Sequence, residues 1–409
     1  MARASSERAI IFLIAAVQFV NILDFVMVLP LGPDFAVALG IPLSHLGYLG
    51  GSYTAAASVA GLIGSLFLDR FDRRLALTVA MIGLVLGTAA GAAATGLATL
   101  MAARVIAGLF GGPATSLAIS IVADVVPPER RGKAMGTVMG AFSVASVLGV
   151  PAGLRLASLA GWRTPFIAVS AMGLLITVGV YLLLPPLRGH LAARQNEPGP
   201  TYAELLGRPT VLISYTMTAV VMMASFILIP NLAAYLQYNL GYPRDKLDLL
   251  YLVGGAVNLV TLQLVGRLVD RFGSFRVGTL GSIMQLGIVY FGFVRPLPSL
   301  PGMALFVSLM FSNSFRNVAY NTLTSKVPSP RERARFMSLQ SAVQHFAAAV
   351  GAFLSSALLT ELPDHRLAGI PRVGSVTISL TLLLPLFLWT VERHVKAPAQ
   401  RPRELVQSA

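Results

Sequence analysis

The sequence predicts an all-α integral membrane protein with twelve transmembrane helices in two pseudo-symmetric six-helix bundles. Three observations predict this fold class. Hydrophobic residues make up 55% of the 409 residues and charged residues only 12%, whereas an ordinary soluble domain is about a quarter charged. Apolar runs of about 20 residues, long enough to cross a bilayer as helices, recur along nearly the whole chain. Charged motifs of the first half also return in the second half at a constant spacing.

The apolar runs give the helices in order. We expect them at residues 10–31, 46–68, 75–96, 98–122, 134–156, 164–185, 209–236, 248–269, 276–294, 300–324, 336–360 and 373–391. The first run is too long for a signal peptide, contains an acid and lacks a small-residue cleavage site, so we expect it to be retained. A charged, Pro/Gly-rich stretch after the sixth run indicates a linker. The predicted units are the N-terminal bundle 1–185, the cytoplasmic linker 186–208, the C-terminal bundle 209–391 and the cytoplasmic tail 392–409.

The basic residues predict the orientation. The chain has 31 Lys and Arg against 17 Asp and Glu. With a cytoplasmic N-terminus, 22 of the basic residues face the cytoplasm and 7 face outward, a clear positive-inside bias. Basic cytoplasmic loops therefore explain the positive charge better than nucleic-acid binding does. Both termini are expected in the cytoplasm.

Two segments of the first half recur 201 residues later. The segment "SLFLDRFDRRLAL" at 65–77 matches "GRLVDRFGSFRVG" at 266–278, and "VPPERRGKAM" from 126 is echoed by "VPSPRERARFM" from 327. Each copy falls at the same place in its half, after the second and the fourth span. Two parallel six-helix halves are typical of a transporter whose substrate path lies at their interface.

These motifs resemble those of the major facilitator superfamily, and within it the bacterial twelve-span drug:proton antiporters and sugar-efflux permeases. The loop after the second span is similar to the signature G-x-L-a-D-r-x-G-r-k. It has the signature's charged residues, with Ser65 and Asp72 in place of the two glycines, and the second copy keeps both glycines. The matching charged residues are Asp69, Arg70, Arg73 and Arg74 in the first copy, and Asp270 and Arg271 in the second. The resemblance implies a cytoplasmic latch that helps to hold an outward-open state; a loop that only sets the topology is the alternative.

Two further motifs carry the resemblance. The fourth span contains "RVIAGLFGG", similar to the R-x-x-x-G motif but with Ala107 where glutamine is usual. The fifth contains "GAFSVASVLGVPAG", similar to the antiporter motif through Gly140, Gly149, Pro151 and Gly153. Glycines allow close helix packing in lipid, so this motif is structural in any case, and a gating role for Gly149, Pro151 and Gly153 is the further expectation.

Asp24 is the acid that we place deep inside a span. Asp24 and Arg104 are each about seven residues from the outer ends of their predicted spans, so at 1.5 Å per residue both lie about 10 Å from the outer face. Equal depth allows them to pair directly or through water. A guanidinium favours the charged carboxylate and a dry pocket favours the protonated one, so Asp24 is the candidate proton carrier and Arg104 its modulator. The alternatives are a static ion pair and direct substrate contact.

Other intramembrane polar residues are candidates for the substrate site. In the tenth span, Asn313, Arg316, Asn317, Tyr320 and Asn321 fall on one helix face, and such a face should meet water or protein. Arg316 can bind an anionic substrate group, pair across the cavity, or extend toward the cytoplasm. Asn21 and Phe25 share the Asp24 stripe, and Gln344 and Asn231 are further candidates. His345 can titrate near neutral pH or serve only as a helix contact.

Several classes of chemistry have no support in the sequence. There is no cysteine, which excludes disulfides and thiolate sites. No ATP-binding motif, metal-ligand spacing or catalytic triad is found. With no such site, we expect no enzyme, metal or cofactor, and transport would have to draw on an ion gradient. Together with Asp24, the resemblance implies a monomeric proton-coupled secondary transporter that exports small amphipathic or drug-like molecules across the lipid bilayer of a bacterial inner membrane. The alternatives are an uptake symporter or uniporter, an exporter of sugars, lysolipids or organic anions, and a receptor that does not transport.

Overall fold

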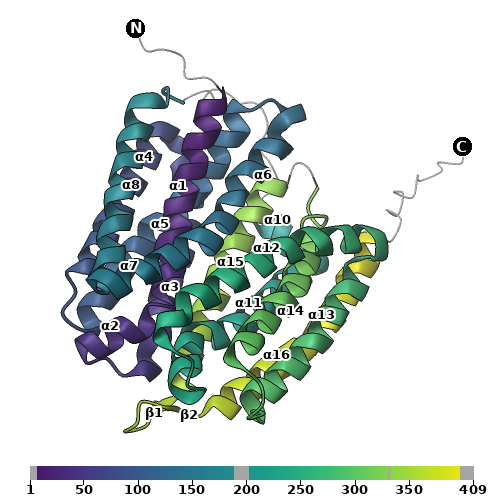
Figure 1. Cartoon of the computed structure of the whole chain (residues 1–409). Coiled ribbons are helices and arrows are strands. Elements are labelled where there is room, and N and C mark those ends of the chain that lie inside the picture. Colours follow the sequence, from purple (N-terminus) through teal and green to yellow (C-terminus); the bar gives the residue numbers. More distant parts are fainter. Residues whose placement is uncertain (1–6, 188–201, 330–331, 397–409) are drawn as a thin grey trace, which may run out of the picture.

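A computed structural model shows a chain that is helical almost throughout (Figure 1). It describes residues 7–187, 202–329 and 332–396. The first half contains α1 (Glu7–Val28), α2 (Gly32–Leu39), α3 (Leu46–Phe67), α4 (Arg73–Ala92), α5 (Leu97–Val125), α6 (Pro128–Val144), α7 (Val150–Ala160) and α8 (Arg163–Leu183). The second half contains α10 (Tyr202–Leu206), α11 (Pro209–Ala234), α12 (Leu247–Phe272), α13 (Ser274–Val289), α14 (Gly302–Thr324), α15 (Arg333–Leu358) and α16 (Ile370–Lys396). Strands β1 (Thr360–Glu361) and β2 (Leu367–Ala368) form a small antiparallel hairpin between α15 and α16.

Short helical turns extend or connect these helices. Three are single 3₁₀ turns, η1 (Leu43–His45), η2 (Leu68–Arg70) and η5 (Arg244–Lys246). Three are π-helical turns, η3 (Ala145–Gly149), η4 (Tyr235–Asn239) and η6 (Tyr290–Val294). The turn η3 joins α6 to α7 without a break, so these two form one long helical stretch.

Each predicted span overlaps one helical stretch, and ten stretches of the described chain are long and apolar enough to cross a membrane. The other two predicted spans correspond to α3, rich in small and hydroxyl residues, and α14, which carries the polar stripe. Helix α16 continues to Lys396, past the start of the predicted tail, and Glu392 and Lys396 form an i,i+4 ion pair at its end. Residues 202–206 of the predicted linker are helical; its residues 188–201 and the tail residues 397–409 lie outside the described chain.

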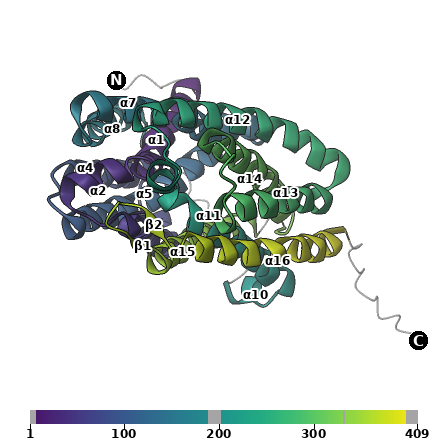
Figure 2. The same cartoon turned by 60° about the horizontal axis from the view of Figure 1, so that its bottom comes forward.

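Helices α1 to α8 lie together on one side of the molecule and α11 to α16 on the other, as two views show (Figures 1 and 2). We call the end at which α1 begins the near end, and the end that holds α2 and the hairpin the far end. The halves meet where α3 packs against α15, where α11 packs against α2 and α3, and where α12 packs against η3 and α7.

Small residues allow the helices of the first half to approach closely. A Cβ atom on Gly108 of α5 would lie 2.2 Å from the carbonyl oxygen of Tyr53 in α3, and one on Gly112 would lie 2.7 Å from that of Ala57. Such contacts are typical of helix packing in lipid, where close backbone approach takes the place of the hydrophobic effect. They fix α3 against α5 and bring Tyr53 to the level of Arg104.

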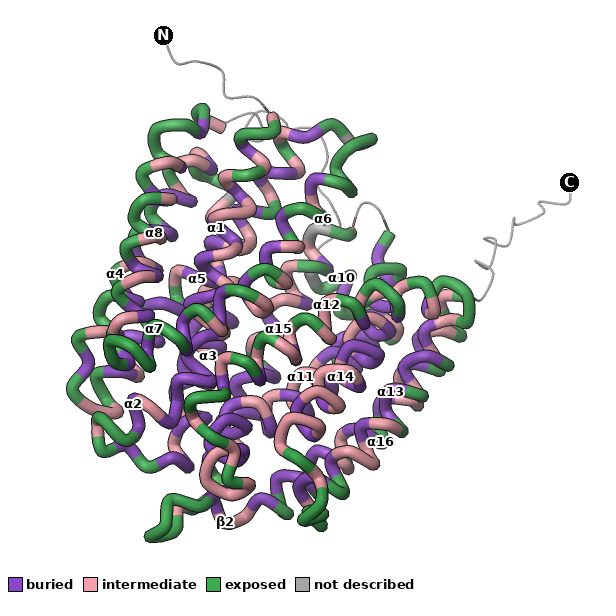
Figure 3. The backbone as a smooth tube through the Cα atoms, viewed as in Figure 1, coloured by how far each residue is buried: buried purple, intermediate pink, exposed green. Residues whose placement is uncertain are grey.

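Exposed residues lie on the outward faces of the peripheral helices, while buried residues concentrate inside (Figure 3). Exposed large apolar side chains include Leu75, Val79, Ile82 and Leu86 of α4, Leu174, Leu175 and Leu182 of α8, and Leu382, Leu386 and Trp389 of α16. Soluble monomers rarely expose so large an apolar surface. It is the surface expected of helices that face lipid.

Candidate functional site

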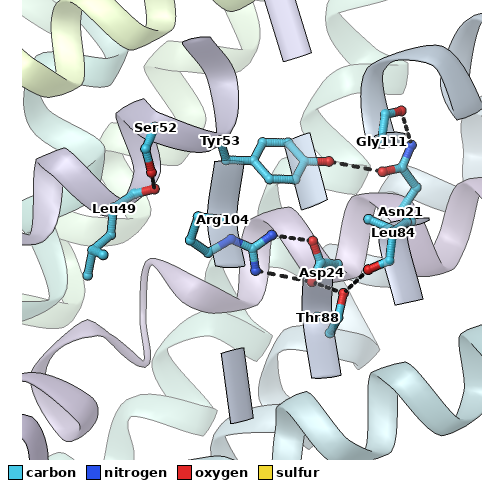
Figure 4. Close-up of polar contacts among 9 residues, drawn as sticks. All are labelled: Asn21, Asp24, Leu49, Ser52, Tyr53, Leu84, Thr88, Arg104 and Gly111. Carbon is cyan, nitrogen blue, oxygen red and sulfur yellow. Dashed lines mark hydrogen bonds and ion pairs between the residues drawn. The ribbon is translucent and has the colours of Figure 1, made fainter. Parts of the chain in front are cut away.

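The first half contains a buried ion pair between Asp24 of α1 and Arg104 of α5 (Figure 4). Arg104 Nη1 donates to Asp24 Oδ1 at 3.1 Å, and Nη2 donates to Oδ2. The hydroxyl of Thr88 in α4 donates to Oδ1 at 2.7 Å. The exposed fractions of Asp24 and Arg104 are 0% and 2%. Three helices therefore hold one carboxylate away from solvent.

Asp24 and Arg104 are in contact, as their similar predicted depth allows. The predicted end of the first helix was wrong. Helix α1 ends at Val28 rather than at residue 31, so Asp24 lies four residues from its end. The chain turns there and starts α2, whose Pro33 and Asp34 stand in its first turn. Proline is favoured at the start of a helix and cannot continue the preceding one.

Tyr53 and Asn21 cover the ion pair. The Arg104 guanidinium lies over the Tyr53 ring, with 5.0 Å between its carbon and the ring centroid, a cation–π contact. The Tyr53 hydroxyl donates to Asn21 Oδ1 at 3.0 Å, and Asn21 Nδ2 donates to the Gly111 carbonyl at 2.8 Å and to Thr115 at 2.7 Å. Tyr53 and Thr88 were not predicted from the sequence. Each places a hydroxyl group within a long apolar helix, and this feature could have marked them as candidates.

Phe25 connects this network to the second half. Its ring stacks on Tyr53 with centroids 5.0 Å apart, and on Phe226 of α11 with centroids 6.0 Å apart. The neighbour of the buried acid on α1 therefore contacts both halves. A displacement of one half relative to the other can act on Asp24 through this stack.

The predicted residues of α14 do not contact the ion pair. Some bond to α11 and α15, and others carry buried polar atoms without a partner among the described residues. Tyr320 accepts a hydrogen bond from Gln344 of α15 at 3.2 Å, and Asn313 accepts one from Ser225 of α11 at 3.4 Å. Arg316 is 0% exposed, and within the described chain its three guanidinium nitrogens have no hydrogen-bond partner. Asn317 Oδ1 is likewise buried and unpartnered. The extension of Arg316 toward the cytoplasm is therefore wrong, because its whole side chain lies inside the protein.

His345 and Asn231 make contacts within the second half. His345 Nδ1 is 2.8 Å from the Ser341 carbonyl, one turn earlier in α15. Asn231 of α11 donates to Ser355 of α15 at 2.8 Å. These contacts satisfy one polar group of each side chain within the second half.

Comparison with known families agrees with this architecture. The family model for the Major Facilitator Superfamily matches residues 14–352 and 215–408. The chain belongs to the major facilitator superfamily. Its members are transporters with membrane-spanning helices, so the chain is a membrane transporter of this class and not an enzyme.

Two curated relatives of this facilitator are named as a resistance protein and an efflux pump. The chloramphenicol resistance protein of Streptomyces lividans is 25% identical over 261 residues, covering 64% of this chain and 67% of the relative. The purine ribonucleoside efflux pump NepI of Escherichia coli O157:H7 is 25% identical over 271 residues, covering 65% of each chain. The chain thus spans about two thirds of the length of these relatives.

Solved structures share the fold of this facilitator. A bacterial homologue of the human lysosomal transporter Spinster, in an inward-facing and occupied conformation, matches with a TM-score of 0.73 at 18% identity, over 96% of this chain and 98% of that one. The xylose transporter XylE from E. coli, in a partially occluded inward-open conformation, matches with a TM-score of 0.71 at 17% identity, over 94% and 99%.

The signature loop of the facilitator lies at the near end. Arg73 forms an ion pair with Asp124 at the end of α5. Arg74 lies over the ring of Tyr181, 5.6 Å from its centroid. Asp72, which replaces a signature glycine, accepts a hydrogen bond from the Arg74 amide at 2.9 Å and so caps α4. These contacts fix the loop to its own half.

The remaining charged residues predicted to act in gating are Arg70, Asp270, Arg271 and Asp69. Arg70 and Asp270 are exposed, and Arg271 lies over the ring of Phe272, 5.2 Å from its centroid. The Asp69 backbone belongs to η2, but its side chain lies outside the described part of the structure.

The glycine-proline motif of the facilitator lies where three helices meet. A Cβ atom on Gly149 would come within 2.7 Å of Leu23 in α1, while Pro151 starts α7 and Gly153 has only Pro165 nearby, at 4.0 Å. The same turn η3 contacts α12, where a Cβ on Gly255 would lie 3.0 Å from the Ser146 carbonyl oxygen. The π turn therefore links the helix that carries Asp24 to the second half.

Polar contacts that sequence reasoning missed join the halves at the far end. Arg244 Nε donates to Asp34 Oδ1 at 2.6 Å, and its Nη2 contacts Oδ2. The amide of Leu43 donates to Glu361 Oε2 at 2.5 Å. Nearer the middle, the hydroxyl of Ser58 donates to the carbonyl of Ala342 at 2.8 Å.

Proposed function

We propose that this chain is a proton-coupled antiporter that exports small amphipathic or drug-like molecules by alternating access. The observation that carries the proposal is the buried contact of Asp24 with Arg104, one residue from the Phe25 stack that reaches the second half. The named activities of the resistance and efflux relatives support export.

The proposed architecture adds α3 and α14 to the ten apolar stretches, giving twelve spans in two bundles of six. The bundles comprise residues 1–185 and 209–391, with a linker at 186–208. Both termini lie in the cytoplasm of a bacterial cell, and the protein acts as a monomer. The basic near end, which includes Arg70, Arg130 and Lys133, supports this orientation.

The structure corresponds to an inward-facing state in this proposal. The polar contacts described between the halves lie at the far end or near the middle, as in Asp34–Arg244, Leu43–Glu361 and Ser58–Ala342. With the near end in the cytoplasm, the far-end contacts close the external side. Asp69, Arg70, Arg73, Arg74, Asp270 and Arg271 are then the loop residues that meet when the cytoplasmic side closes, and the π turn with Gly149, Pro151 and Gly153 is the pivot.

The physical basis of coupling is the energy of a buried charge. A carboxylate removed from water needs a counter-charge, and separation from its partner leaves it with two options, rehydration or protonation. In the outward-facing state Asp24 takes up a proton and releases Arg104. In the inward-facing state Arg104 returns to the carboxylate, and the proton leaves to the cytoplasm. His345 is a secondary candidate for the proton path.

The substrate site lies between the two halves. Asn21 and Phe25 of α1, Asn313, Arg316, Asn317 and Tyr320 of α14, Gln344 of α15 and Asn231 of α11 are its proposed contacts. Stacked aromatic rings such as those of Phe25 and Phe226 suit apolar substrates, and the Asn and Gln side chains can orient a substrate through hydrogen bonds. Rearrangement of the buried α14 residues is required for substrate to reach them.

Flux through liposomes tests the coupling. The purified protein is reconstituted, and substrate flux is measured with and without an imposed pH gradient. Asp24→Asn should fold and bind a neutral substrate, yet lose the pH-driven part of the flux, because an amide cannot exchange a proton. Asp364→Asn, in the exposed hairpin, is the matched carboxylate control and should behave as the wild type. Wild-type pH-driven flux from Asp24→Asn would refute the proposal.

A second candidate function, transport of organic anions, rests on Arg316. Its buried guanidinium has no partner within the described chain, and an unpaired buried charge is strongly unfavourable. An organic acid and its primary amide should separate the two functions in a binding assay. If anions are the substrates, Arg316→Gln lowers affinity for the acid about tenfold and leaves amide binding unchanged. Lys326→Gln, which removes an exposed basic residue just after the same helix, should change neither. Equal binding of acid and amide by the wild type would exclude this candidate.

A further inference from the structure

A cavity of about 560 Å³ opens between the near ends of α1 and α6. Its charged lining consists of Glu7, Arg8, Arg130 and Lys133, and its apolar lining includes Ile11 and Phe12. The transport cycle proposed above uses none of these residues. The cavity is therefore a separate feature of the first half.

The polar part of the cavity is positively charged. Arg130 is neutralised by Glu7, since its Nη2 donates to the carboxylate at 2.9 Å. Arg8 and Lys133 are exposed, and no carboxylate within the described residues pairs with either. Both α1 and α6 also begin at this end, and the N-terminus of a helix carries a partial positive charge that favours anions. Two basic side chains and two helix ends thus converge on one opening.

The apolar part of the cavity lies deeper along α1. Phe12 stands one turn after Arg8, about 6 Å further along the helix axis, and it is 70% exposed. Ile11 lies beside it and is half-buried. On a membrane-spanning helix an exposed aromatic side chain at this depth faces acyl chains. The lining therefore changes from cationic to apolar in the direction from the membrane surface to its interior.

We propose that this cavity binds an anionic glycerophospholipid, with the phosphate against Arg8 and Lys133 and an acyl chain along Phe12. A free phosphate ion or a soluble anion would use the cationic part alone and leave the apolar wall without a function. The assignment to the cytoplasmic leaflet rests on the orientation proposed above, whereas the binding itself does not. A lipid held there bridges α1, which carries Asp24, and α6, which leads into the π turn.

Native mass spectrometry of the purified protein tests this site. We expect retention of phosphatidylglycerol over phosphatidylcholine with the same acyl chains. The double variant Arg8→Gln, Lys133→Gln should weaken phosphatidylglycerol binding about tenfold or more, because each basic residue at a membrane surface contributes to the attraction. Its matched control is Arg267→Gln, Arg276→Gln, which removes two exposed near-end arginines of the second half. The control should retain phosphatidylglycerol as the wild type does.

A third variant separates a lipid from a free anion. Phe12→Ala should lower affinity for phosphatidylglycerol and leave the response to inorganic phosphate unchanged. Three results would each overturn the proposal: equal binding of the two lipids by the wild type, equal losses in the pocket and control variants, or unchanged lipid binding by Phe12→Ala. Loss of proton-coupled transport in Asp24→Asn leaves this test unaffected, because lipid retention is measured without substrate.

Discussion

Glu7 and Arg208 occupy equivalent positions in the two halves, 201 residues apart, and each forms an ion pair with a residue of its own half. The acid of the first pair is replaced by a base in the second. Glu7 of α1 accepts from Arg130 of α6 at 2.9 Å. Arg208, directly before α11, donates to Glu332, directly before α15, at 2.6 Å. The first and fifth long helical stretches of each half are thus tied at the near end. The contact between these two stretches therefore occurs in both halves, with acid and base in exchanged places.

The second of these pairs predicts a dependence of stability on pH. Burial raises the pKa of Glu332, but hydrogen bonds from the Ser329 amide and from Arg208 outweigh it, so the pKa lies below its usual value. The unfolded chain then binds the proton more readily than the folded one. The stabilisation is present above the unfolded pKa and is lost as pH falls through the folded pKa.

Glu332→Gln should therefore lower the melting temperature in detergent slightly at pH 7, since a partly exposed pair contributes about 1 kcal/mol or less. The difference from the wild type should vanish in acid, as pH falls below about 4. Arg208→Gln removes the other partner of the pair and should lower the melting temperature at pH 7 in the same direction. A difference that grows toward acid would contradict the sign of this prediction.

Removal of Arg104 should destabilise the fold more than removal of the whole ion pair. Arg104→Gln leaves Asp24 buried and without its counter-charge, and such a loss costs about 3–5 kcal/mol. The double variant Asp24→Asn, Arg104→Gln places two neutral amides there and should melt at a higher temperature than Arg104→Gln alone. Melting curves of the wild type, both single variants and the double variant give the interaction free energy between Asp24 and Arg104. Strictly additive effects would show that the two groups do not interact.

The Asp34–Arg244 pair should hold the far end closed. The chain has no cysteine, so Tyr48→Cys gives a single label site at the interface, where Tyr48 lies 6.1 Å from the Phe353 ring between centroids. Adding Asp34→Asn should raise its rate of labelling by a membrane-impermeant maleimide up to about fivefold, because a partly exposed pair contributes about 1 kcal/mol or less.

The exchange variant Asp34→Arg, Arg244→Asp serves as the control for the far-end pair. It restores opposite charges in reversed order and should return labelling toward the original rate. Unchanged labelling in Asp34→Asn would mean that other contacts alone keep this end closed.

Gly149 should tolerate no larger side chain unless Leu23 is shortened. A Cβ atom at Gly149 would lie 2.7 Å from Leu23 Cδ1, whereas one at Gly140 meets no atom within 4 Å. Gly149→Val should therefore lower the melting temperature and the transport rate, and overpacking of this kind costs about 1–3 kcal/mol. Leu23→Ala in the same chain should recover part of the loss. Gly140→Val, from the same motif, is the matched control; an equal effect there would show that helix propensity, not contact with α1, is responsible.

Local periodicity was enough to locate the long helices. Twelve apolar runs predicted helices that the structure contains, because a bilayer-spanning helix must be apolar over a fixed length whatever its neighbours are. The ends were less certain: α1 stops at Val28, where the chain turns into the unpredicted α2, and α16 continues to Lys396. Helix ends depend on caps, turns and partners that apolarity does not encode.

The candidate site was predicted only in part. Depth along two helices brought Asp24 and Arg104 to one level, and the structure joins them. Thr88 and Tyr53 could not be assigned in advance, because which helix faces which, and at what rotation, is a property of packing. Asn313, Arg316 and Tyr320 share a face as expected, yet their partners come from α11 and α15 or are missing among the described residues.

The sequence by itself determined that this is a helical membrane protein of the facilitator type, with a repeat of 201 residues and an acid and an arginine at similar depth. Only the tertiary structure decided that Asp24 is bidentate to Arg104, that Phe25 links it to Phe226, and that Asp34 closes the far end with Arg244. Hydropathy and spacing are properties of one segment, and a single chain shows them directly. Contacts between segments depend on how helices rotate and approach, which is set by the packing of all of them together.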